Sequence, residues 1–92
     1  MFNLFSSMFK RKKDSIKLLG RAGMSFYDGN NEYYLDTDNI RNEVEELDIV
    51  IYYSGTGLRN ESRPLSIEEK ISIAARVREI MESGGARVGF RD

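Results

Sequence analysis

Catalytic or metal-binding chemistry in this chain would have to come from carboxylates, hydroxyls and lysines, because its 92 residues include no histidine and no cysteine. Those two residue types supply many of the nucleophiles, general bases and metal ligands of proteins. The remaining groups form no evident pair: Glu45 and Glu46 are adjacent and would point apart in an extended chain. No nucleophile, base and orienting group come together in the sequence. We therefore predict a protein that is not an enzyme and has no cofactor or metal.

Two short segments resemble the beginnings of ligand-binding motifs. Gly55-Thr56-Gly57 follows a predicted strand, but Asn60 stands where a dinucleotide fingerprint needs its third glycine. Asp36-Thr37-Asp38-Asn39 begins like a calcium loop, but Ile40 and Arg41 occupy the fifth and sixth positions, which need an oxygen ligand and a glycine. We interpret the first segment as the tip of a glycine-rich loop and expect no calcium site in the second.

The charges are separated along the chain although the formal net charge is only −1. A basic run covers residues 10–13, and residues 36–48 are strongly acidic with Arg41 as their only cation. Such a separation favours distinct electrostatic faces, although ordinary solvated loops would give the same runs. The isoelectric point near 5.5 argues against nucleic-acid binding.

Tyrosines and arginines near the acidic stretch could anchor a protein interface, since both residue types are frequent at interface centres. The alternative for each tyrosine is cross-strand packing with its hydroxyl in water. Adjacent tyrosines in a strand place one ring on each face of the sheet. Our candidate partner-binding residues are Asp36, Asp38, Glu43, Glu45, Glu46, Asp48, Tyr52, Tyr53, Arg59 and Arg63.

The elements that position these residues follow from hydrophobic periodicity. Alternation predicts strands at 14–27 (bent at Gly20 and Gly23), 32–36, 47–53 and 86–90, with a long loop at 54–63. Ser66 and Glu69 form a capping box that begins a helix ending near Met81. Its expected core stripe is Ile67, Ile71, Ala74, Val77 and Met81, widened by Ile73 and Ile80. The order β-β-β-α-β predicts a single small α+β domain with one helix on about four mainly antiparallel strands.

Residues 1–13 differ from the domain that we expect at 14–92. Phe2, Phe5 and Phe9 fall near one face of a short helix that precedes the basic run. Such a leader could contact an anionic membrane or dock on the domain itself. Because the basic residues follow the apolar ones, it does not read as a signal peptide, and we expect a cytoplasmic protein.

Residues 15–90 resemble the Imm74 family of bacterial immunity proteins. The similarity runs through Ser15-Ile16-Lys17, residues 23–27 and residues 49–53. It continues through Pro64, Ser66, residues 68–70, Ile73, Gly85 and residues 88–90. A tryptophan expected shortly before the proline is absent here, where Arg59 to Arg63 stand. The resemblance implies a small non-enzymatic partner of a polymorphic toxin, with no catalytic residues.

Two functions from different classes follow. The first is an immunity protein that occludes the active surface of a cognate toxin, which would be encoded nearby. Against a nuclease, the carboxylates of residues 36–48 could imitate phosphates and steer association. The alternative is a membrane-peripheral adaptor or regulatory domain anchored through Met1–Lys13.

Overall fold

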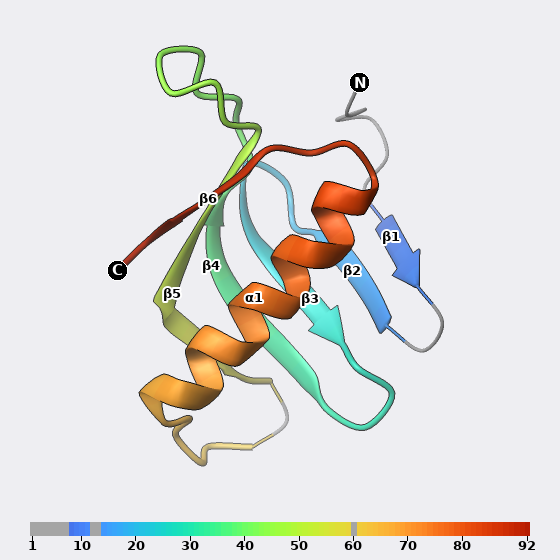
Figure 1. The fold of residues 1–92 in the computed structure, drawn as a ribbon. Coiled ribbons are helices and arrows are strands. Elements are labelled where there is room, and N and C mark those ends of the chain that lie inside the picture. Colours follow the sequence, from blue (N-terminus) through green and yellow to red (C-terminus); the bar gives the residue numbers. More distant parts are fainter. Residues whose placement is uncertain (1–7, 12–13, 60) are drawn as a thin grey trace.

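The computed structural model describes residues 8–11, 14–59 and 61–92. Within these ranges the chain forms one mixed sheet in the order β1-β2-β3-β4-β5-β6, with a single helix across one face (Figure 1). Neighbouring strands are antiparallel except β5 and β6, which are parallel because the helix crosses over between them. The expected α+β class is confirmed, with more strands than expected. The elements are β1 (Met8–Arg11), β2 (Asp14–Leu18), β3 (Ala22–Tyr27), β4 (Glu32–Asp38), β5 (Ile49–Leu58), α1 (Ile67–Ser83) and β6 (Val88–Arg91).

One additional strand arises because residues 14–27 form a hairpin and not the single bent strand that we predicted. The chain reverses at Gly20, whose φ of 91° is accessible to glycine but strained for other residues. Leu19 N donates to Gly23 O at 3.1 Å and closes the turn. Both strands direct their apolar residues to the same face, so alternation alone did not reveal the reversal.

The other additional strand lies within the predicted leader. Met8–Arg11 pairs with β2, with Met8 opposite Lys17 and Arg11 opposite Asp14. This part of the leader is therefore a strand of the sheet and not the helix that the phenylalanine spacing suggested. The rest of the leader, residues 1–7 and 12–13, lies outside the described residues.

The hydrophobic core lies between α1 and the sheet. The helix buries Ala74, Val77, Ile80 and Met81 against residues that include Ile16, Met24, Phe26, Leu35, Ile49 and Ile51. Our expected stripe was wrong at its beginning, since Ile67 and Ile71 are 49% and 48% exposed. Two apolar stripes run along this helix, and the one through Ile73 and Val77 packs on the sheet.

The predicted helix start is confirmed. Glu69 N donates to Ser66 Oγ at 3.1 Å, and Ser66 N donates to Glu69 Oε1 at 3.0 Å. The helix ends at Ser83, and Gly85 adopts a φ of 96° just beyond it. No helix in the described part of the chain is both long and apolar enough to cross a membrane.

Strand β5 extends through the region that we predicted to be a loop. Asp36 pairs with Tyr52 and Tyr34 pairs with Gly57, so the β5 residues between Tyr52 and Gly57 bulge opposite Leu35. A Cβ at Gly55 would lie 2.6 Å from the Asp36 Cβ, closer than two such atoms can approach. Gly55-Thr56-Gly57 is therefore a bulged strand and not the tip of a loop.

Candidate functional site

The loop between β4 and β5, residues 39–48, projects from one end of the sheet (Figure 1, green). Asn42 N donates to Leu47 O at 2.7 Å and Leu47 N donates to Asn42 O at 3.0 Å, which closes a short tip. Within the tip, Glu45 N donates to Asn42 Oδ1 at 3.0 Å, and Glu46 adopts a φ of 57°. These contacts give the predicted carboxylates Glu43, Glu45 and Glu46 a defined backbone and leave them exposed.

The base of this loop is fixed to β6 by Asp48, which is only 5% exposed. Its Oδ1 accepts from Arg41 Nη1 at 2.9 Å, and its Oδ2 accepts from Arg87 N at 2.9 Å. Leu47 covers Gly89, because a Cβ added at Gly89 would lie 2.4 Å from the Leu47 Cδ1. Asp48, predicted as a partner-binding residue, is thus occupied inside the molecule and holds the loop in place.

The sheet face opposite the helix displays three more predicted residues. Asp36 and Asp38 are exposed on β4, and Tyr52 lies on the same face of β5 through its pairing with Asp36. Tyr52 Oη donates to Asp38 Oδ2 at 2.6 Å, and this hydrogen bond raises the pKa of Tyr52. Tyr34, 38% exposed, follows the same alternation of β4 and was missed as a site residue, although that alternation predicted its face.

A groove of about 490 Å³ separates the loop from this sheet face. Its charged lining includes the predicted Asp38, Glu43 and Glu45. Arg41 and Arg91 also line it, and Arg91 forms an ion pair with Glu45. Arg91 was missed because β6 reaches the loop through the fold and not through the sequence, whereas Arg41 was noted in the acidic stretch but not chosen as a site residue.

Apolar side chains of the loop are unusually exposed for a small domain. Val44 is 95% exposed at the tip, and Ile40 is 56% exposed beside the groove. Val44 stands between Glu43 and Glu45 in the sequence. Val44 therefore provides the most exposed aliphatic side chain among the exposed large hydrophobic residues of the described chain.

Tyr53, Arg59 and Arg63 do not belong to this surface. Tyr53 packs against the core on the helix side, and its hydroxyl donates to Asp92, which raises the pKa of Tyr53. The two arginines follow β5, at the end of the sheet away from the loop.

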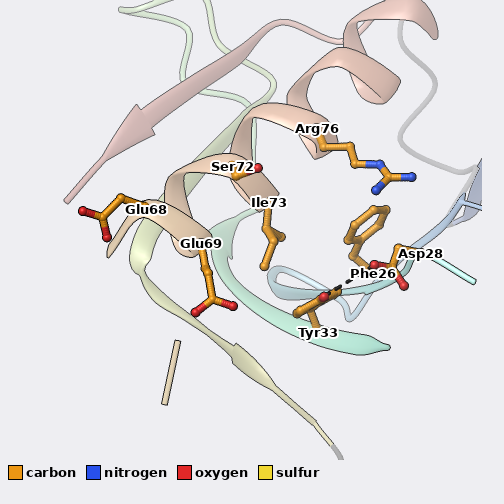
Figure 2. Close-up of a pocket in the computed structure, with 8 residues that line it drawn as sticks. All are labelled: Phe26, Asp28, Tyr33, Glu68, Glu69, Ser72, Ile73 and Arg76. Atoms are coloured by element: carbon orange, nitrogen blue, oxygen red, sulfur yellow. Dashed lines mark hydrogen bonds between the residues drawn. The ribbon is translucent and has the colours of Figure 1, made fainter. Parts of the chain in front are cut away.

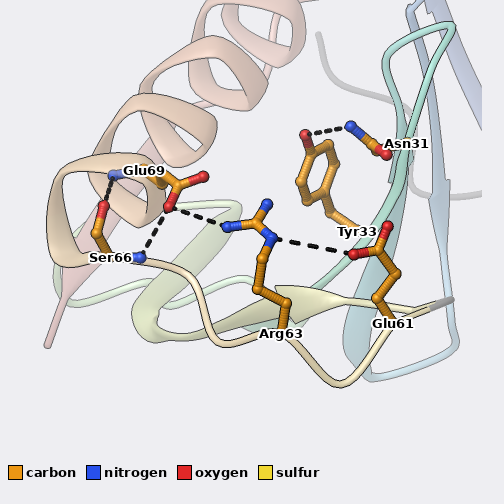
Figure 3. A network of polar contacts seen from close by, with 6 residues as sticks. All are labelled: Asn31, Tyr33, Glu61, Arg63, Ser66 and Glu69. Carbon is orange, nitrogen blue, oxygen red and sulfur yellow. Dashed lines mark hydrogen bonds and ion pairs between the residues drawn. The ribbon is translucent and has the colours of Figure 1, made fainter.

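Both arginines form ion pairs where they are. Arg59 Nε lies 3.3 Å from Glu32 Oε2. Arg63 Nε lies 3.9 Å from Glu61 Oε2, and Arg63 Nη1 lies 3.5 Å from Glu69 Oε1. These ion pairs connect the loop before α1 to the capping box (Figure 3). The ten predicted residues therefore divide between an acidic surface and separate structural positions.

A second pocket, of about 380 Å³, lies between α1 and the β3–β4 hairpin (Figure 2). Phe26 and Tyr33 are stacked in its wall with ring centroids 6.0 Å apart, but they are only 1% and 9% exposed. Arg76 lies over Phe26 and binds Asp14 with two hydrogen bonds, at 2.7 and 3.2 Å.

Two of the three carboxylates that line this second pocket, Asp28 and Glu69, accept hydrogen bonds within the fold. Burial raises the pKa of Asp28, but hydrogen bonds from the backbone N–H groups of Asn31 and Asn30 outweigh it and leave the pKa below its ordinary value. The backbone N–H of Ser66 likewise lowers the pKa of Glu69. We therefore take the projecting loop and the adjoining groove, not this pocket, as the candidate site.

Among residues 8–11, 14–59 and 61–92, no three carboxylates are grouped so that they could hold a metal ion. No protein-family model, curated protein or solved structure matches this chain.

Proposed function

We propose that this chain is a non-enzymatic immunity protein that binds a cognate bacterial toxin and covers its active surface. The observation that carries the proposal is the projecting loop, which presents the 95% exposed Val44 among exposed carboxylates on a hydrogen-bonded tip. The choice of a bacterial toxin as the partner rests on the sequence resemblance of residues 15–90 to immunity proteins. In this proposal the toxin is encoded nearby and is neutralised in the cytoplasm.

Binding through this loop has a simple physical basis. Its tip is closed by backbone hydrogen bonds and its base is held by Asp48, so little conformational entropy is lost when a partner orders it. Val44 supplies apolar area that loses water in the complex. The surrounding carboxylates steer the protein toward a basic surface, such as the cleft of a nuclease.

The sheet face next to the loop extends the proposed interface. Asp38 and Tyr52 line the groove, and Asp36 lies on β4 opposite Tyr52. Tyr34 continues the exposed surface along β4. Asp48 is left outside the interface because it is buried, and Tyr53, Arg59 and Arg63 because they lie on other parts of the molecule. In this proposal the binding surface lies opposite the face that carries α1.

Co-expression with a toxic neighbouring gene product tests the proposal. The wild-type protein should rescue growth and co-purify with the toxin. Val44→Asp should weaken the complex by about ten- to a hundredfold, as expected for removal of a central apolar contact. Ile71→Asp is the matched control, because this isoleucine is 48% exposed on α1, on the helix-covered side of the sheet. Loss of binding in the control with no change in Val44→Asp would place the interface on the helix side instead.

A further inference from the structure

The groove beside the projecting loop has an excess of negative charge once its ion pairs are counted. Arg41 is paired with Asp48 at 2.9 Å, and Arg91 is paired with Glu45. Asp38 accepts a hydrogen bond from the neutral hydroxyl of Tyr52 and has no cationic partner among the described residues. Glu43 likewise has no ion pair within the described part of the chain. Two lining carboxylates therefore remain without a compensating cation.

Two aliphatic residues also line the groove. Val50, only 5% exposed, lies on β5 next to the Tyr52 ring, and Ile40 contributes a further aliphatic side chain. A groove lined by aliphatic side chains and uncompensated carboxylates suits a side chain with an aliphatic stem and a cationic head. The volume of about 490 Å³ leaves room for one such side chain. An anion would meet the excess carboxylates and be repelled.

We propose that this groove receives a basic side chain of the toxin, an arginine or a lysine, beside Asp38 and Glu43. The inference rests on the proposed function for the identity of the partner, but the groove can be examined in the isolated protein. It adds a defined subsite to the loop contact: Val44 enters the partner, and a cation of the partner enters the groove. Tyr52 is a positioning residue here, because its hydroxyl holds the Asp38 carboxylate at 2.6 Å.

The test is a titration of the ¹⁵N-labelled full chain with N-acetyl-arginine amide and N-acetyl-lysine amide at constant ionic strength. N-acetyl-citrulline amide is the matched neutral probe, with nearly the same shape as the arginine probe. We expect saturable shifts of the amides of Asn42, Glu43 and Tyr52 with the cationic probes only. Asp38→Asn and Glu43→Gln should each weaken binding about three- to tenfold, whereas Glu68→Gln on α1 should leave it unchanged.

The outcomes separate this subsite from the proposed function. Equal amide shifts with the citrulline probe would overturn the subsite even if toxin rescue succeeds. Unchanged binding of the cationic probes to both Asp38→Asn and Glu43→Gln would do the same. Saturable cation binding that depends on Asp38 and Glu43 would support the subsite even if rescue fails. Both variants change exposed side chains, and their circular dichroism spectra should match the wild type.

Discussion

At the scale of single residues, the side-chain amide of Asn39 joins two turns that are distant in sequence. Its Nδ2 donates to Gly20 O and to Gly23 O, both at 2.9 Å, while Thr37 Oγ1 donates to its Oδ1 at 2.7 Å. Asn39 is 6% exposed, so these groups have little access to water. The residue thus connects the β2–β3 turn to the start of the projecting loop.

Replacing this amide should be costly. Asn39→Ala would leave two carbonyls and a hydroxyl without their partner, and we expect a loss of about 2–3 kcal/mol in the free energy of unfolding. Urea denaturation measures the change, with exposed Asn30→Ala as the matched control. Equal stability of the two variants would contradict the assigned role of Asn39.

Two glycines of β5 provide a second matched comparison. A methyl group at Gly55 would meet the Asp36 Cβ at 2.6 Å, whereas one at Gly57 would meet nothing within 4 Å. We expect Gly55→Ala to destabilise the protein by about 1–3 kcal/mol through overpacking. Gly57→Ala should be neutral or stabilising by up to about 1 kcal/mol, because it restricts the unfolded chain. Thermal unfolding distinguishes them, and similar midpoints would show that the bulge does not require Gly55.

Sequence reasoning was limited at this scale by contacts that only the fold creates. The carboxylates of the acidic stretch look alike in sequence, yet Asp48 is 5% exposed while Glu43 is solvent-exposed. Burial of Asp48 depends on Arg41 and on the backbone of Arg87, and Arg87 lies far along the chain. Local composition identified the acidic stretch but could not separate its structural carboxylate from its surface ones.

At the scale of elements, local signals were sufficient where the determining contacts are local. The capping box of Ser66 and Glu69 predicted the helix start, because both hydrogen bonds join residues three positions apart. The bulge in β5 was not predicted, because the pairing of that strand with β4 depends on Tyr34 and Asp36. Its two glycines therefore resembled a loop.

The helix cap should make stability depend on pH. Its hydrogen bond from Ser66 N lowers the pKa of Glu69 in the folded protein. A carboxylate whose pKa is lower in the folded than in the unfolded state stabilises the fold above the unfolded-state pKa, and that contribution is lost as pH falls through the folded-state pKa. The stability difference between wild type and Glu69→Gln should therefore shrink as the pH is lowered from neutrality into the acid range.

Urea midpoints recorded over this pH range measure the effect. Glu68→Gln is the control, because Glu68 belongs to the same helical turn but not to the capping box. The role of the cap would be contradicted if the stability difference between wild type and Glu69→Gln were constant with pH. It would also be contradicted if Glu68→Gln showed the same pH-dependent stability difference from wild type.

At the scale of the whole molecule, one sheet face is covered by α1 and the other carries the exposed carboxylates Asp36 and Asp38. The fold class could be predicted because the helix and most strands have strong hydrophobic periods. Most acidic residues of the candidate surface were named from the sequence, but Arg91 was not, since β6 reaches the groove only through the fold.

This distribution of charge predicts fast, salt-sensitive association with a basic toxin surface. Reversing Glu43, Glu45 and Glu46 to lysine should lower the association rate constant at least about tenfold at low salt, with a smaller effect at high salt. Reversing Glu61, Glu68 and Glu82 to lysine is the control, because it changes the net charge by the same amount at a different place. Stopped-flow mixing measures both, and unchanged rates for the loop variant would exclude electrostatic steering by this loop.

The central claim is that the protein inhibits by occupying its toxin and not by chemistry. The most direct measurement is a titration of the purified toxin's activity with increasing amounts of this protein. Stoichiometric binding predicts that toxin activity falls linearly to zero at about one equivalent, without a slow phase. With Val44→Asp the same fall should need a higher concentration of inhibitor. Progressive loss of toxin activity at a small fraction of an equivalent, or no loss at several equivalents, would contradict it.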